Sequence, residues 1–303
     1  MKGLFLDASD ALAAVFRTVS RGTDPAVDVN IQAQVDPAEL PGMLAGYCFV
    51  LNDHSFMPTD AMRGCTGLRH VIFLGTGARS YMDPEALAAL GIQVHTIKGY
   101  GDTAVAEHAI ALLFAAARGL ARMDRGMRGG AWLRTEGVQL HGKTLGLLGY
   151  GGIAHEAARI ACGIGMRVLA WNRTPRTAEG VEFVPLDRLL AESHAVSVHL
   201  LLTDETRGLL GAAGLAAMRP GAILVNTARG AIVDEAALLD ALRSGHLGHA
   251  ALDVFDQEPL PPGHPLTALD NVTLSAHSAF RTPEANETLI RRALDIACQV
   301  ARG

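Results

Sequence analysis

The sequence predicts an α/β protein with two doubly wound domains, each built on a parallel sheet. Short apolar runs of strand type alternate with helical patterns along the chain, and this alternation is typical of parallel sheets with right-handed crossovers. At 303 residues the chain exceeds what one hydrophobic core normally holds. Apolar residues make up 49% of it, so each of two domains can bury a sizeable core.

The first domain is predicted from five strands and the helices between them. Strands are expected at 3–6, 27–31, 47–51, 70–74 and 92–97, and helices at 11–19, 37–44, 58–63 and 83–90. Ligands of such sheets bind beyond the carboxyl ends of the strands. After the fourth strand, the loop with Thr76 and Gly77 could form a nest of backbone N–H groups for a carboxylate, or a plain turn. After the third, His54 could face a substrate, or be a solvated loop histidine.

The second domain centres on segment 142–174, which predicts a strand, a glycine-rich turn, a helix carrying Ile160 and Met166, and a second strand. Gly149 allows the tight turn, Gly151 allows a pyrophosphate to approach the backbone, and Ala154 allows close helix–strand packing. The N–H groups that open the helix suit an anion. We therefore predict a dinucleotide site, with an ordinary turn as the alternative. Its turn residues are Tyr150, Gly151, Gly152 and Ile153.

The end of the second strand of this unit bears on the choice of cofactor. NAD enzymes usually place an acidic side chain there for the ribose hydroxyls, but this chain has Asn172, followed by Arg173 and Thr174. A neutral amide does not repel a 2′-phosphate, and the guanidinium and hydroxyl can bind one. NADP is therefore favoured over NAD. The alternative is that Arg173 is a solvated charge and either cofactor is used.

The remaining elements complete the predicted domain organisation. Further strands are expected at 181–185, 195–200, 222–226, 248–253 and 271–274, and further helices at 186–192, 205–218 and 235–244. A long helix from about Thr103 leads into the second domain, and a last helix at 283–301 returns to the first. This predicts a Rossmann dinucleotide-binding domain at 100–281, inserted into a flavodoxin-like substrate domain formed by 1–99 and 282–303.

Composition excludes several classes of function. The net charge of −5 and the lack of a basic cluster argue against nucleic-acid binding. The apolar stretch at 104–121 is interrupted by Glu107, His108 and Arg118, and the beginning of the chain does not resemble a signal peptide, so a cytoplasmic protein without membrane contact is expected. The four cysteines have no paired spacing, so we expect reduced thiols and no metal site.

Three candidate catalytic side chains follow predicted strand ends: Arg229, Glu258 and His277. If they meet, they suit the reduction of a 2-keto acid, in which the carbonyl oxygen becomes an alkoxide. Arg229 would bind the carboxylate and polarise the carbonyl, His277 would donate the proton, and Glu258 would orient His277 and favour its charged form. Spacing alone leaves open a surface arginine, a loop glutamate and a structural histidine.

The segments GYGGIA, VNTARGAIVDEAALLDAL, LDVFDQEPLP and NVTLSAHSAF, in this order, resemble the successive signatures of the D-isomer-specific 2-hydroxyacid dehydrogenase family. GTGARSYMDPEALAALGIQV and AVAEHAIAL are similar to its carboxylate loop and interdomain helix. The resemblance implies a catalytic triad of Arg229, Glu258 and His277, and a homodimer through the dinucleotide domains. It also implies that Thr76 and Gly77 present N–H groups to the ligands. The nicotinamide amide is expected near Asp253 and the Thr227–Ala228 backbone, and His199, Leu200 and Thr206 complete the predicted cofactor contacts.

The sequence departs from the family pattern at two positions, and it does not decide the substrate. Ala276 and Leu201 stand where the family often has proline, which puts the fit of the cofactor in doubt. The absence of a cationic cluster disfavours 3-phosphoglycerate, whereas glyoxylate, hydroxypyruvate or a larger 2-keto acid remain open. The alternative class is a dinucleotide-sensing binding protein of the corepressor type, against which the complete triad argues.

Overall fold

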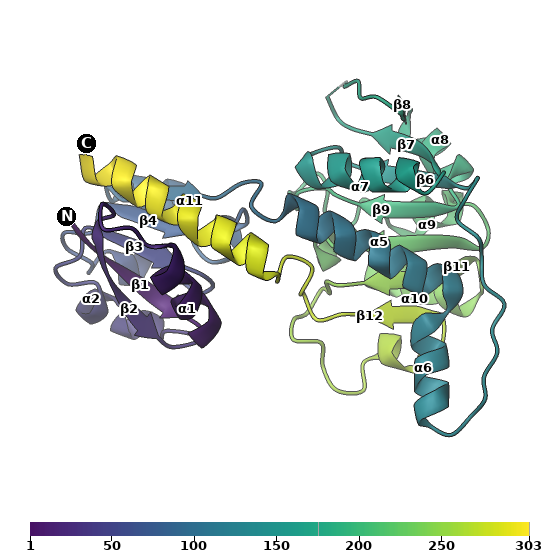
Figure 1. Cartoon of the computed structure of the whole chain (residues 1–303), viewed down its shortest axis with the longest axis horizontal. Coiled ribbons are helices and arrows are strands. Elements are labelled where there is room, and N and C mark those ends of the chain that lie inside the picture. The colour runs from purple at the N-terminus through teal and green to yellow at the C-terminus, as the bar shows by residue number, and fades with distance from the viewer. Residues whose placement is uncertain (175, 303) are drawn as a thin grey trace. The chain divides into compact units, whose positions relative to one another are not determined.

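The computed structural model describes residues 1–174 and 176–302, which form two compact units. Unit 1 comprises residues 1–101 and 281–302, and unit 2 comprises Asp102–Phe280. Each unit has one sheet, with five strands in unit 1 and seven in unit 2 (Figure 1). All ladders between named strands are parallel, which confirms the predicted fold class.

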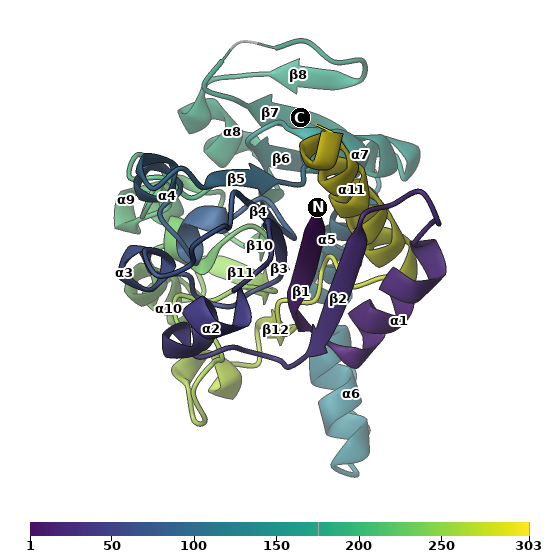
Figure 2. The ribbon, with the colours of Figure 1, turned by 90° about the vertical axis from the view of Figure 1, so that its left-hand side faces the viewer.

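The sheet of unit 1 has the strand order β2-β1-β3-β4-β5, which is the flavodoxin-like order. Its strands are β1 (Lys2–Ala8), β2 (Ala26–Ile31), β3 (Phe49–Asn52), β4 (His70–Phe73) and β5 (Gln93–Thr96). One face is covered by α1 (Asp10–Val19) and α11 (Pro283–Arg302), and the other by α2 (Leu40–Met43), α3 (Thr59–Met62) and α4 (Pro84–Ala89), as Figure 2 shows. Each face buries its own apolar cluster, so the sheet lies in the middle of the core.

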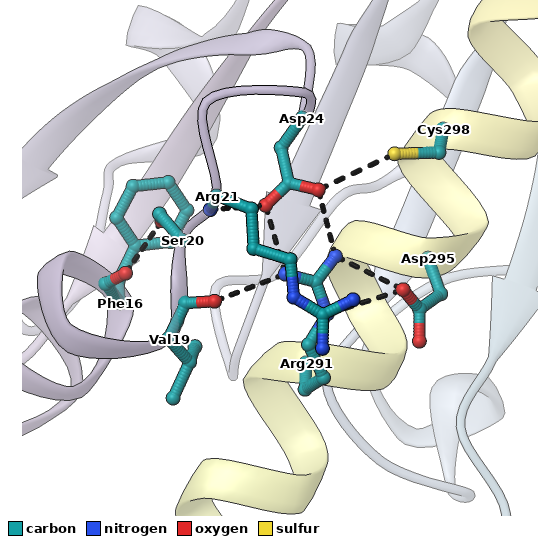
Figure 3. A network of polar contacts seen from close by, with 8 residues as sticks. All are labelled: Phe16, Val19, Ser20, Arg21, Asp24, Arg291, Asp295 and Cys298. Carbon is teal, nitrogen blue, oxygen red and sulfur yellow. Dashed lines mark hydrogen bonds and ion pairs between the residues drawn. The ribbon is translucent and has the colours of Figure 1, made fainter.

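Arg291 fastens α11 to the turn between α1 and β2 (Figure 3). Its guanidinium donates to both carboxylate oxygens of Asp24 at 2.8 Å and to Val19 O at 3.0 Å, and it also pairs with Asp295. The Asp24 side chain is 6% exposed, and the hydrogen bond from Arg291 holds the pKa of Asp24 far below its usual range. Residues distant in sequence are therefore joined in unit 1 by a bidentate, partly buried ion pair.

The sheet of unit 2 has the order β12-β11-β10-β9-β6-β7-β8. This is the Rossmann order 3-2-1-4-5-6 with one more strand at its end. Its strands are β6 (Thr144–Leu148), β7 (Arg167–Trp171), β8 (Val181–Phe183), β9 (Ala195–Val198), β10 (Ala222–Asn226), β11 (Leu247–Leu252) and β12 (Val272–Leu274). The chain therefore reverses its direction across the sheet between β6 and β9, where ligands bind in sheets of this kind.

Helices cover both faces of this sheet. On one face lie α5 (Asp102–Arg118) and α7 (Gly152–Gly163), and on the other α8 (Leu186–Glu192), α9 (Ala212–Ala217) and α10 (Glu235–Arg243). Gly119, at φ 61°, separates α5 from α6 (Leu120–Arg128). No single helix in the described part of the chain is long and apolar enough to cross a membrane. Only α5 and α6 together, bent by 66°, have the required length and composition.

The sequence-based helix boundaries were wrong at three places. The helix expected at 205–218 is a turn followed by α9, because Gly208 has a positive φ and Leu210 pairs with Val233 instead. Met166 lies beyond α7, which ends in a glycine cap at Gly165 with Met166 N–H bonded to Ala161 O. The helix expected at 37–44 is a 3-10 turn, Pro37–Glu39, followed by α2, which has Pro41 in its first turn.

Candidate active site

The glycine-rich turn after β6 has the geometry that an anion site requires. Gly149 adopts φ 93°, and a side chain there would meet His199 O at 2.8 Å. At Gly152 a Cβ would lie 1.8 Å from an Asp102 carboxylate oxygen. Gly151 instead caps α7 with extended backbone and would point a side chain into open space. The N-terminus of a helix of 12 residues is therefore open to an approaching anion at Gly151.

The side chain of Asn172 holds this turn against the loop after β7. Its Oδ1 accepts from Tyr150 N–H at 3.2 Å, and its Nδ2 donates to Thr174 O at 2.7 Å. Arg173 is exposed and pairs with Glu205 Oε2 at 2.7 Å. Tyr150 is buried, with its ring against Phe183, so its side chain is a packing element. Among these residues, Arg173 and Thr174 have their side chains exposed to an incoming ligand.

Arg229 follows β10 in a turn that Asn226 closes. Asn226 Nδ2 donates to Arg229 O at 3.0 Å, and its Oδ1 accepts from Ala228 N–H at 3.0 Å. Gly230 then packs directly on the backbone of Phe255, since a Cβ at Gly230 would lie 2.0 Å from Phe255 C. Only glycine fits there. This close approach joins the loop of Arg229 to the loop that leads to Glu258.

Glu258 and His277 form a hydrogen-bonded pair. His277 Nδ1 lies 2.6 Å from Glu258 Oε2, and Glu258 Oε1 accepts from Phe255 N–H at 2.9 Å. Burial acts to raise the pKa of Glu258. The hydrogen bonds from His277 and Phe255 N–H, with the charges of His277 and Arg229, outweigh it and lower that pKa. Glu258 is therefore an anion in contact with His277 and within the electrostatic reach of Arg229.

Asp253, directly after β11, organises the segment that carries His277. Its carboxylate is fully buried and accepts from Ser275 Oγ at 2.6 Å, Ser278 N–H at 3.0 Å and Ala279 N–H at 2.9 Å. Its backbone oxygen accepts from His277 N–H at 2.7 Å, and His277 adopts φ 48°. This left-handed conformation is uncommon outside glycine, so the contacts around Asp253 determine where the imidazole lies.

A family model described as "D-isomer specific 2-hydroxyacid dehydrogenase, NAD binding domain" matches residues 110–279, the part of the chain that carries this geometry. The chain belongs to this family. A glyoxylate reductase of Aeropyrum pernix is 44% identical over 257 residues, which cover 80% of this chain and 76% of that protein. A hydroxypyruvate reductase of Thermotoga maritima is 36% identical, with 78% of each chain covered. A D-3-phosphoglycerate dehydrogenase of Archaeoglobus fulgidus is 37% identical, over 86% of this chain but 50% of that longer protein.

Solved structures agree with this membership. The apo-structure of D-lactate dehydrogenase from Escherichia coli matches with a TM-score of 0.89 at 27% identity, covering 100% of this chain and 98% of that one. An acyclic imino acid reductase in complex with NADPH and D-Arg matches with a TM-score of 0.86 at 26% identity, covering 100% and 98%. This dehydrogenase is thus an NAD(P)-dependent oxidoreductase acting on CH–OH donors, a 2-keto acid reductase that resembles glyoxylate and hydroxypyruvate reductases.

The other predicted cofactor residues of the dehydrogenase lie at the carboxyl edge of the unit 2 sheet. His199 follows β9, hydrogen-bonds Ser197 Oγ at 2.9 Å, and has its pKa lowered by burial to about 4. Thr206 folds the same loop by bonding Leu201 O at 2.6 Å and Thr203 N–H at 2.8 Å. Leu200 and Ile153 are partly buried against the cores. The buried Thr227 Oγ1 has no hydrogen-bond partner among the described residues.

The candidate substrate residues of unit 1 lie at the carboxyl ends of β3 and β4. His54 Nδ1 contacts Asp53 Oδ2 at 2.8 Å, and this hydrogen bond raises the pKa of His54. Thr76 is exposed, and Gly77 precedes a 3-10 turn at Ala78–Ser80. Among the described residues, the N–H groups of Thr76 and Gly77 donate to no backbone oxygen. The loop therefore keeps the donors that a nest would need, and its binding of a carboxylate stays a prediction.

Sequence reasoning missed three residues that hold the site together: Asn226, Ser275 and His108. Ser275 Oγ gives its proton to Asp253, so it accepts from His108 Nε2, 3.0 Å away. Ser275 stands two residues before His277, which was a usable signal, whereas His108 lies 167 residues away on α5. The positions of the three candidate catalytic groups thus depend on further side chains around them. Within the described residues, no cluster of three or more His, Cys, Asp or Glu could hold a metal ion.

Proposed function

We propose that this dehydrogenase reduces small 2-keto acids such as glyoxylate or hydroxypyruvate, favours NADPH, and uses Arg229, Glu258 and His277 for catalysis. The observation that carries the proposal is the hydrogen bond of 2.6 Å between His277 and Glu258, with Arg229 near enough to influence Glu258. The similarity to glyoxylate and hydroxypyruvate reductases supports the substrate class.

Each side chain has a chemical task that follows from its type. The bound nicotinamide supplies the hydride. Arg229 binds the carboxylate with two parallel N–H groups and stabilises the negative charge that grows on the carbonyl oxygen. His277 Nε2 donates the proton to that oxygen, because Nδ1 is occupied by Glu258. Glu258 keeps the ring oriented and favours its charged form.

The cofactor is held by the glycine turn and the loop after β7. Gly151 leaves space at the N-terminus of α7 for a pyrophosphate. Both polar atoms of the Asn172 side chain are hydrogen-bonded within the protein. This position therefore offers the ribose no carboxylate. Arg173 and Thr174 then bind a 2′-phosphate, which is the basis for the NADPH preference.

A screen of 2-keto acids with NADPH and NADH, followed by absorbance, tests this function. We expect turnover of glyoxylate or hydroxypyruvate, a higher kcat/KM with NADPH, and a shift of about tenfold or more towards NADH in Asn172→Asp. A wild type that prefers NADH, or a ratio unmoved by the substitution, would contradict the cofactor proposal. Turnover of none of these acids would contradict the substrate proposal.

A 3-phosphoglycerate dehydrogenase activity is the second candidate. It is favoured by the relative of that name, which is 37% identical to this chain. Oxidation of 3-phosphoglycerate faster than that of glycerate would establish it. The same assay with both substrates at equal concentration separates the two candidates.

We also propose a homodimer formed through unit 2 and a cytoplasmic location. Five large apolar side chains of α5, α6 and the following segment are at least 40% exposed: Phe114, Leu120, Met127, Trp132 and Val138. Such a group of side chains suits a second copy of the chain. Sedimentation should give twice the mass of the chain, and Trp132→Glu, at the most exposed position, should shift it towards the monomer.

The four free thiols suit a reducing compartment.

A further inference from the structure

The strand order of unit 2 places an ion pair across the glycine turn. β6 lies between β7 and β9, so the turn after β6 is flanked by the loop that carries Arg173 and the loop that carries Glu205. Neighbouring strands are about 4.8 Å apart, so the flanking strands are about 10 Å apart. Arg173 Nη1 and Glu205 Oε2 nevertheless meet at 2.7 Å. The two side chains therefore reach towards each other over the predicted cofactor path.

Both ends of this ion pair are positioned by contacts within their own loops. Thr206 folds the loop of Glu205 through its bonds to Leu201 O and Thr203 N–H. Asn172 fixes the loop of Arg173 to the glycine turn. The side chains themselves are 80% and 72% exposed, so water screens their attraction. The pair is thus held in place by the fold and yet is weak enough for a ligand to open.

We propose that Glu205 is a specificity-determining residue that competes with the adenosine 2′-phosphate for Arg173. The proposal rests on the assignment of Arg173 as the 2′-phosphate ligand. A 2′-phosphate must displace the carboxylate from the guanidinium and then lies close to a like charge. The uncharged 2′-hydroxyl of NADH can donate to a carboxylate and leaves the ion pair intact. Glu205 therefore reduces the NADPH preference that Arg173 creates.

Equilibrium binding to the whole protein, without substrate, tests this directly. In Glu205→Gln we expect calorimetric titration to show about threefold to tenfold tighter NADPH binding, and NADH affinity within about twofold of wild type. Adenosine 2′,5′-bisphosphate should follow NADPH, and 5′-AMP should follow NADH, because these probes isolate the adenosine end. Added salt should reduce the difference between variant and wild type.

Asp204→Asn is the matched control. Asp204 precedes Glu205 on the same exposed loop, and it makes no ion pair within the described part of the chain. Its substitution removes the same charge without freeing Arg173, so it should tighten NADPH binding much less than Glu205→Gln. Equal effects would overturn the proposal, because they would reflect net charge alone.

Arg173→Ala separates this proposal from the function on which it rests. If Arg173→Ala weakens NADPH binding while Glu205→Gln leaves it unchanged, Glu205 is no competitor, although Arg173 still selects NADPH. If Arg173→Ala leaves NADPH binding unchanged, the assignment of Arg173 fails and the competition fails with it. When both hold, the effect of Glu205→Gln should shrink in the Arg173→Ala background.

Discussion

Asp7 in unit 1 and Asp253 in unit 2 are buried aspartates that each bind the loop after a neighbouring strand. Asp7 is the penultimate residue of β1 and accepts N–H groups from residues 53–55, after the neighbouring strand β3, at 2.7 to 2.8 Å. Asp253 follows β11 and accepts N–H groups from the loop after the neighbouring β12. Both carboxylates are fully buried, and each bound loop carries a candidate site histidine, His54 or His277.

The two carboxylates differ in their remaining partners. Burial raises the pKa of Asp7 above 3.8, because hydrogen bonds from the backbone of Asp53 and His54 and from the Ser55 side chain compensate only in part, and the charge of Asp53 adds to the rise. Burial also acts to raise the pKa of Asp253, but His108 and Ser275 add hydrogen bonds that lower it below 3.8. The balance between burial, hydrogen bonds and nearby charge therefore shifts the pKa values of the two carboxylates in opposite directions. Asp253, with the lowered pKa, supports the loop of the predicted proton donor, and Asp7, with the raised pKa, supports the loop of a predicted substrate contact.

The largest expected difference between these loops is catalytic. His277→Gln removes the proton donor and should lower kcat/KM for keto-acid reduction by about 10³-fold. His54→Gln should lower it by less than about tenfold, mainly through KM, because a substrate contact can be replaced by water. Steady-state kinetics of both variants measure this. Equal losses would mean that the two loops contribute alike to the reaction.

Arg229 lies in unit 2 near the pair of Glu258 and His277, so its substitution should also have a large effect on catalysis. Arg229→Lys keeps the charge and loses the planar pair of donors, which should cost on the order of 3 kcal/mol in transition-state binding. KM should rise and kcat should fall together, because the carboxylate persists while charge grows beside it. Kinetics with one keto acid at saturating cofactor measure both. Unchanged values would place Arg229 outside the site.

Stability should separate the two carboxylates next. Asp253→Asn should destabilise the protein by about 2–4 kcal/mol and Asp7→Asn by about 1–2 kcal/mol. In both variants the NH2 group of the amide faces a backbone N–H donor. Only Asp253→Asn also removes a carboxylate whose charged form is favoured by its partners. Urea unfolding at neutral pH measures both values. A larger loss in Asp7→Asn would reverse the comparison.

The pH dependence of these losses should have opposite signs. Asp253 has a lowered pKa, so its contribution is complete above 3.8 and is lost as pH falls through the folded-state pKa. Asp7 has a raised pKa, so its contribution is complete below 3.8 and is lost as pH rises through the folded-state pKa. The cost of Asp253→Asn should therefore decrease on acidification, and that of Asp7→Asn should increase. Parallel curves would show that the two groups titrate alike.

The smallest expected effect concerns the partner of His277. Glu258→Gln keeps the shape and removes the negative charge that favours the protonated ring. The alkaline fall in reduction rate should then move to lower pH, and the acid limb of substrate oxidation should move in the same direction. A deuteride isotope effect should first establish that chemistry limits the rate. A profile identical to wild type would disprove the pairing.

Most strands and helices could be predicted because the pattern that specifies each one lies within its own segment. The range of β10 and that of α8 were predicted to the residue, since an apolar run and a helical period lie within each segment. The helix expected at 205–218 failed where Gly208 and Thr206 favour a turn, a competition that hydrophobic period does not reveal.

The candidate site was predictable in its named residues and not in its supports. Motifs mark Arg229, Glu258 and His277 as candidates, and the pairing of Glu258 with His277 could be proposed from residue type. The contacts of Asp7 join residues 46 to 48 positions apart, and Arg173 meets Glu205 over 32 positions. No sequence periodicity links such partners, so they come together only through the order of the strands in each sheet.

The ion pair between Arg291 and Asp24 has a consequence for how the chain is made. Arg291 leaves the ribosome 267 residues after Asp24, together with the apolar side chains of α11 that cover one face of the unit 1 sheet. Unit 2 is continuous in sequence, so all of its contacts can form before α11 is synthesised. Until α11 is synthesised, unit 1 therefore has one sheet face covered by α1 alone, and Asp24 lacks its arginine. Unit 1 is the part of the chain on which chaperones would act.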